Sequence, residues 1–216
     1  MKIKSLVRRA RMQRAGRRRA GPREYLTIGV CLVAVLATLY VTLRPPRGVA
    51  TATSGTTVTG VTPTKWGPLN DTDRLLLTKV RQAGLWEMPT GQQAQQRAHS
   101  AKVKEAGAHI MAEHMVLDAD VRDTAAQLGV VLPSTPNSDQ QSWMAELSTK
   151  SGDDYDRDFA FRLRAAHGKV FGIIAQVRAS TSNSLIRAFA TRALQTVLRH
   201  MTYLESTGLV DYSTLT

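Results

Sequence analysis

The sequence predicts an all-α protein, a four-helix bundle that is preceded by one N-terminal transmembrane helix. Three observations carry this prediction. Four long stretches of the carboxyl-terminal part place apolar residues at intervals of three and four, the spacing of a helix with one buried face. A run of nineteen residues near the amino terminus contains no charge. No stretch alternates between apolar and polar residues as a half-buried strand does.

The positive charge of the chain gathers at its amino terminus. The whole chain has a formal net charge of +12. Residues 1–47 hold twelve Lys or Arg and one acid, a net charge of +11, so the remaining residues carry a net charge of only +1. Ten of the bases lie in residues 1–24, a basic cytoplasmic arm without apolar periodicity. The nearly neutral remainder predicts no nucleic-acid partner, and we expect the arm to set membrane topology and contact acidic lipid headgroups.

Residues 25–43 (YLTIGVCLVAVLATLYVTL) are the predicted transmembrane helix. At about 1.5 Å per residue the run spans roughly 28 Å, close to the ~30 Å hydrocarbon core of a bilayer. Ten bases precede it and only Arg44 and Arg47 follow closely, which places the amino terminus in the cytoplasm and the carboxyl-terminal domain outside. The predicted localisation is the cell membrane, with one span acting as a signal-anchor. The alternative is a cleaved secretory signal, for which residues 35–37 (VLA) give a weak cleavage sequence.

The extracytoplasmic part divides into a linker and a domain. Residues 44–69 are rich in Thr, Gly and Pro and predict an extended linker that holds the domain away from the membrane. Residues 70–216 are expected to form the helical domain. The single cysteine, Cys31, lies inside the apolar run, so no intrachain disulfide is possible.

The first two long helices are predicted at 71–98 and 100–128. Pro89 should kink or interrupt the first of them, because proline lacks the backbone N–H of a helix interior. Ser100 suits the N-cap of the second helix. Gly129 suits its carboxyl end, where a left-handed residue commonly stands.

The second pair of long helices is predicted at 153–179 and 182–206. The third helix has the most regular apolar spacing, with successive intervals of 4, 3, 4, 3 and 4. Asp153 or Asp154 is expected to cap its amino-terminal end. Residues 130–152 predict a loop rich in Pro and Ser with a short helical piece, QQSWMAEL. The sequence leaves open whether this connection is short or crosses the bundle.

The order and spacing of four sequence blocks resemble a known family. The blocks are RQAGLWEMPTGQQAQQRA (81–98), AHIMAEHMVLDADVRDTAAQLGVVLP (108–133), DYDRDFAFRLRAAHGKVF (154–171) and VLRHMTYLESTGLVDY (197–212). They resemble the DUF4142 family, in the form found in actinobacteria, over nearly the whole extracytoplasmic domain. The resemblance implies an exported or membrane-tethered domain with a ferritin-like helical fold, in a family of unknown function.

Each predicted helix places one polar residue on its apolar face, where a leucine would be expected. The four residues are Glu87, His114, His167 and His200. All lie within about six residues of their helix midpoints, or roughly 9 Å at 1.5 Å per residue. The sequence therefore allows the four side chains to meet near the middle of the bundle.

Three imidazoles and one carboxylate suit a transition metal or zinc, so these four residues are a candidate metal site. The di-metal sites of ferritin-like proteins use Glu-x-x-His motifs. That motif is absent here, where the acids nearest to His114 are Glu113 and Asp118, so a di-iron oxidase is not expected. Without a metal or other cofactor, the cluster would satisfy its own hydrogen bonds and fix helix register. His99 and His109 lie off the apolar faces and are expected at the surface.

Two functions of different classes remain open on these observations. The first is a non-enzymatic, membrane-tethered extracytoplasmic bundle that binds an unknown protein or envelope partner. The second is metal storage, sensing or redox chemistry at the four polar residues. The sequence contains no glycine-rich phosphate loop, nucleophile elbow or Cys/His zinc spacing, so no catalytic residue is assigned. Whether the purified domain contains bound metal distinguishes the two hypotheses.

Overall fold

The computed structural model describes residues 60–215 of the chain. The expected basic arm at 1–24, the expected transmembrane helix at 25–43 and the first part of the expected linker lie outside the described residues. Within 60–215, none of the helices combines the length and the apolar content that a bilayer span requires.

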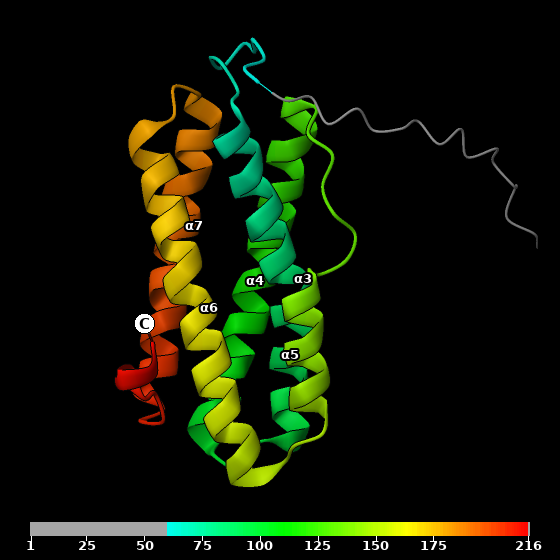
Figure 1. The fold of residues 1–216 in the computed structure, drawn as a ribbon, viewed down its shortest axis with the longest axis vertical. Coiled ribbons are helices and arrows are strands. Elements are labelled where there is room, and N and C mark those ends of the chain that lie inside the picture. The colour runs from blue at the N-terminus through cyan, green and yellow to red at the C-terminus, as the bar shows by residue number, and fades with distance from the viewer. Residues whose placement is uncertain (1–59, 216) are drawn as a thin grey trace, which may run out of the picture. The chain divides into compact units, whose positions relative to one another are not determined.

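Four long helices form a bundle in the described part of the chain (Figure 1). They are α3 (Asp71–Arg97), α4 (Ala101–Leu128), α6 (Gly152–Ser180) and α7 (Ser184–Ser206). A shorter helix, α5 (Ser138–Ser148), and the 3-10 turn η1 (Tyr212–Thr214) complete the elements. Between residues 60 and 215 there are two isolated β-bridges and no strand. The predicted all-α bundle is confirmed, and each long helix lies within two residues of its expected bounds.

The connection between α4 and α6 crosses the length of the bundle (Figure 1). α3 and α7 run in one direction and α4 and α6 in the other, so α3–α4, α4–α7, α7–α6 and α6–α3 are antiparallel neighbours. Ala98, just after α3, forms a parallel bridge with Gly152 at the start of α6. Arg81 Nε donates to the Pro133 carbonyl at 3.3 Å and holds the crossing loop against α3. The bundle therefore has one long crossover connection.

The predicted ends of α4 are confirmed. The Ser100 side chain accepts a hydrogen bond from the Val103 N–H at 3.4 Å. Gly129 follows α4 in the left-handed region with φ 67°, and its N–H bonds to the last turn of the helix. Glycine adopts this conformation without the steric penalty that a Cβ brings.

The expected cap of α6 is wrong in position. The N-cap residue is Ser151, which makes no side-chain capping bond, and the helix already begins at Gly152. Asp153 and Asp154 lie inside the first turn. Their carboxylates still lie close to the positive end of the helix dipole, so the favourable charge is retained without the capping bond.

Of the two effects expected at Pro89, a kink or an interruption, the interruption is wrong, because α3 is continuous from Asp71 to Arg97. Packing around the proline explains why one missing backbone hydrogen bond is tolerated. Thr90 Oγ1 donates to the Trp86 carbonyl at 2.7 Å, and the Tyr155 hydroxyl donates to the Thr90 carbonyl at 3.2 Å. Trp86 and Tyr155 are fully buried, so tertiary burial outweighs the local cost of proline.

Residues 60–69, the end of the expected linker, pack against the bundle. Thr62 and Leu69 form an antiparallel bridge, and Leu69 is buried. The Asn183 side chain donates to Thr64 Oγ1 and to the Gly67 carbonyl at 3.1 and 3.0 Å. These residues therefore belong to the folded unit and connect its amino-terminal segment to the start of α7.

The apolar interior consists of two clusters with polar residues between them. On α4, Leu117 belongs to one cluster and Ile110 to the other, and His114 lies between them. α7 repeats the pattern with Val197, His200 and Leu204. We call the set Glu87, His114, His167 and His200 the polar layer.

Two glycines, Gly91 and Gly107, bring α3 and α4 into close contact about one to two helical turns from the polar layer, toward the α3–α4 turn. A Cβ on Gly91 would overlap the Gly107 carbonyl oxygen, and a Cβ on Gly107 would lie 2.9 Å from the Ala94 Cβ. No side chain larger than hydrogen fits at either position without a shift of one helix.

We predict that Gly91→Ala lowers the free energy of unfolding by about 1–3 kcal/mol, the usual effect of overpacking. Gly172→Ala is the matched control, because Gly172 is an exposed position in the interior of α6 with no atom close to its missing Cβ. This control should raise the free energy of unfolding by up to about 1 kcal/mol through helix propensity. Urea denaturation measures both values, and equal effects of the two substitutions would contradict the close helix contact.

Candidate metal centre

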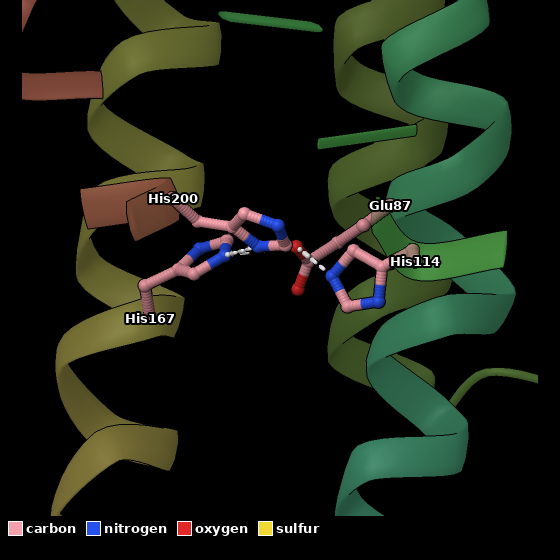
Figure 2. A group of neighbouring side chains, drawn as sticks. All are labelled: Glu87, His114, His167 and His200. Carbon is pink, nitrogen blue, oxygen red and sulfur yellow. Dashed lines mark hydrogen bonds and ion pairs between the residues drawn. The ribbon is translucent and has the colours of Figure 1, made fainter. Parts of the chain in front are cut away.

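The structure brings the four residues of the polar layer together (Figure 2). Each comes from a different long helix, and each offers one ligand atom within 4.8 Å of the other three. Their exposed fractions are only 0–2%. The sequence expectation that these side chains can meet at mid-bundle agrees with this arrangement.

The carboxylate of Glu87 lies at the centre of the contacts. Its Oε2 accepts a hydrogen bond from His114 Nε2 at 2.9 Å. The same oxygen lies 3.2 Å from His167 Nε2. His167 Nε2 in turn lies 3.0 Å from His200 Nδ1. Figure 2 shows the three rings arranged around this carboxylate.

The backbone fixes the tautomer of His167. Its Nδ1 lies 2.7 Å from the Leu163 carbonyl oxygen, which can only accept, so Nδ1 carries the proton and donates it. In the neutral ring, Nε2 then presents a lone pair to Glu87 and His200. His200 Nδ1–H donates to that lone pair, which leaves His200 Nε2 buried without a hydrogen-bond partner. His114 Nδ1 is likewise buried without a partner.

Burial and the neighbouring side chains shift the pKa values of three members of the polar layer. Burial raises the pKa of Glu87, but the neighbouring His167 and His114 outweigh burial and hold that pKa below its usual range. Burial lowers the pKa of His167, against the charge of Glu87. Burial, followed by the adjacent His167 and His114, also lowers the pKa of His200.

Glu87 Oε2 and His167 Nε2 are 3.2 Å apart. In the neutral ring the single lone pair of His167 Nε2 accepts from His200, so among these rings it is His114 that donates a hydrogen bond to Glu87 Oε2. A cation between Oε2 and Nε2 would bind both atoms at once.

The spacing of the donor atoms fits a metal ion. Zinc ligands at about 2.0–2.1 Å in a tetrahedron lie roughly 3.3 Å from one another. Three of the six distances between donor atoms of the polar layer measure 2.9, 3.2 and 3.0 Å, and the other three are at most 4.8 Å. The bond from His167 Nδ1 to a backbone carbonyl is the support that metal-binding histidines usually have. The donor set of three nitrogens and one oxygen suits zinc or a first-row transition metal.

A second group of possible metal ligands lies at the end of the bundle where α3 meets α4. His99, Asp153 and Asp156 lie close together, but His99 and Asp153 are exposed. The oxygens of Asp156 accept the backbone N–H groups of His99 and Ser100 at 3.2 and 2.7 Å, and His99 Nδ1 pairs with Asp153 at 2.7 Å. The carboxylates of this group therefore already have hydrogen-bond partners, and these bonds connect the α3–α4 turn to α6. Both His99 and His109 are exposed, as predicted.

Sequence reasoning missed one carboxylate beside the polar layer. Glu113 Oε2 lies 3.5 Å from His200 Nε2. Glu113 also accepts hydrogen bonds from Arg199 and Tyr203. The sequence held a usable signal, since Glu113 and Asp120 on one helix and Arg192 and Arg199 on another are each seven residues apart.

Comparison with known proteins gives one match. A family model described as "Domain of unknown function (DUF4142)" matches residues 61–206. No curated protein and no solved structure matches the chain.

We predict that the metal-free protein loses stability as pH falls below about 6.5, the usual pKa of histidine. Because burial lowers the pKa of His167 and His200, the unfolded chain binds more protons than the folded chain in this range. The free energy of unfolding should therefore fall by up to about 1.4 kcal/mol per pH unit for each of these histidines.

Chemical denaturation between pH 8 and 5.5 in the presence of a chelator measures this slope. His200→Gln should flatten it, while His109→Gln, at an exposed position, should leave it unchanged. An identical slope in the His200→Gln variant and the unsubstituted protein would rule out the buried neutral ring.

Proposed function

This chain belongs to the DUF4142 family, and we propose that its function is to bind one zinc or transition-metal ion in the polar layer. The convergence of four buried donor atoms from four helices is the observation that carries the proposal. Because the ligands are spread along the sequence, the ion would connect all four long helices at once.

The hydrogen bonds of the metal-free cluster favour this proposal over a purely structural cluster. A buried polar atom without a partner costs about 1–3 kcal/mol. Without an ion, His200 Nε2 lacks a hydrogen-bond partner, and Glu87 Oε2 lies 3.2 Å from His167 Nε2 without a hydrogen bond from that neutral ring. With an ion, His200 would bind through Nδ1 and carry its proton on Nε2, which faces Glu113 Oε2. Binding would thus give His200 Nε2 a partner and hold Glu87 Oε2 and His167 Nε2 on one cation.

Such a site would hold a metal ion rather than catalyse a reaction on it. Four protein ligands fill a tetrahedral coordination sphere, whereas catalytic zinc sites keep one position open for water or substrate. The ligands are also sealed from solvent. A non-enzymatic storage or sensing role therefore accords with the geometry better than hydrolysis does. A redox role would require iron or copper in the same position.

We place this function outside the cell, in a bundle tethered to the membrane. The uncharged run at 25–43, with ten bases before it, supports a single span with the amino terminus in the cytoplasm. The single crossover connection supports the ferritin-like variety of four-helix bundle. Binding of a protein or envelope partner remains the second candidate function, with no specific surface assigned to it.

We predict about one metal ion per chain in protein purified without a histidine tag after growth with iron, zinc, manganese and copper. His114→Gln combined with His167→Gln should abolish binding, because it removes half of the ligands. His99→Gln combined with His109→Gln removes the same number of histidines from the surface and should retain the ion. Elemental analysis of the three proteins measures the content.

Added metal should also stabilise the unsubstituted protein, by about 2.7 kcal/mol when the free ion is at one hundred times its dissociation constant. A folded, unsubstituted protein that stays metal-free after both growth and loading would contradict the proposed function.

We predict that the protein sediments with membranes and resists extraction by high salt and by alkaline carbonate. Replacing Val33 and Leu36 by Asp places two charges near the centre of the apolar run and should release the protein from the membrane, because each charge at the centre of a span costs about 2.5–3.5 kcal/mol. Protease added to intact cells should reach the bundle. Release of a shortened chain that begins after residue 37 would instead establish a cleaved secretory signal.

A further inference from the structure

A groove runs along the surface between α4 and α7, beside the polar layer. Its volume is about 510 Å³. Among the residues that line it are Glu113, Val116, Asp120, Arg192 and Arg199. The groove thus combines an apolar floor with two acidic and two basic side chains.

Two ion pairs bridge the groove at positions one heptad apart on both helices. Arg192 pairs with Asp120 through two bonds of 2.8 Å, one to each carboxylate oxygen. Arg199 pairs with Glu113 through bonds of 3.0 and 2.7 Å, both to Oε2. The two pairs have almost the same exposure, with half-exposed arginines and carboxylates at 24% and 22%.

The two pairs differ in what lies behind them. Glu113 Oε2 is 3.5 Å from Nε2 of the fully buried His200. One heptad away, the residue that corresponds to His200 is Ala193 and the residue that corresponds to His114 is Val121, both in the apolar core. The Glu113–Arg199 pair therefore connects the groove to the polar layer, whereas the Asp120–Arg192 pair lies over hydrocarbon.

An ion needs a path to ligands that are 0–2% exposed. Glu113 offers one, since its carboxylate contacts both a ligand residue and the groove. Arg199 occupies Oε2, and the Tyr203 hydroxyl donates to Oε1 at 3.0 Å. Arg199 is a long side chain at the surface, so moving it away from Glu113 requires far less rearrangement than separating two helices.

We infer that a divalent cation reaches the polar layer through the groove between α4 and α7, where Glu113 captures it and Arg199 closes the path. This inference rests on the proposed function. Glu113 binds the cation first, beside Nε2 of His200, and a turn of the His200 ring then admits the cation to the polar layer. Arg199 and Tyr203 hold the empty carboxylate. Substitutions of the two residues should therefore have opposite effects on the rate of cation entry. Glu113 attracts the incoming cation, whereas Arg199 competes with it for the same oxygen.

The test measures how fast Co²⁺ loads into the metal-free full-length protein and how fast a chelator removes it, both by the visible absorbance of bound cobalt. Glu113→Gln should slow loading and release about tenfold, the lower range of electrostatic effects on association. Arg199→Ala should speed both steps several-fold. Asp120→Asn and Arg192→Ala are the matched controls and should leave both rates unchanged.

A path residue changes both rates by the same factor, so the Kd for Co²⁺ in Glu113→Gln should stay within about twofold of the unsubstituted value. A residue that only positions His200 would instead weaken Kd by about 10–100-fold, mainly through faster release, and that result would overturn the inference. Equal loading rates in Glu113→Gln and Asp120→Asn, with full cobalt content, would overturn the path alone. No cobalt binding by the unsubstituted protein would overturn the proposed function and the path together.

Discussion

The bundle is organised by one constraint: four polar side chains lie in a layer that has no access to solvent. Glu87 and three histidines separate two apolar clusters, and buried polar atoms must find partners. In this arrangement of the helices, Oε2 of Glu87 lies within 3.2 Å of two different imidazole rings. The layer therefore links α3, α4 and α6 at one register, and the contact of His167 with His200 adds α7.

This layer also connects the interior to the surface. His200 lies between the cluster, through Nδ1, and Glu113, through Nε2. Glu113 belongs in turn to a surface pair with Arg199. Two contacts, His200 with Glu113 and Glu113 with Arg199, therefore connect the buried layer to a side chain in solvent. The equivalent pair of Asp120 and Arg192 lacks this connection. Of the two ion pairs, only Glu113–Arg199 therefore contacts a residue of the polar layer.

Much of the fold and of the site follows from periodicity. Apolar intervals of three and four locate the long helices, and a polar residue in an apolar position marks each member of the layer. The helix continues through Pro89 because burial of Trp86 and Tyr155 is a tertiary effect that local propensity does not contain. The direction of the crossover depends on contacts between distant residues such as Ala98 and Gly152. The sequence predicts no role for Glu113 because this residue lies off the apolar stripe, and only its position against α7 brings it to His200.

The central claim is that the polar layer coordinates an ion through three imidazole nitrogens and one carboxylate oxygen. X-ray absorption spectroscopy at the edge of the bound metal tests it most directly. For zinc, the account predicts four N/O ligands at about 2.0–2.1 Å, with the outer-shell scattering of three imidazole rings. A spectrum without imidazole scattering, or one unchanged when His167 and His200 are replaced by Gln, would contradict it.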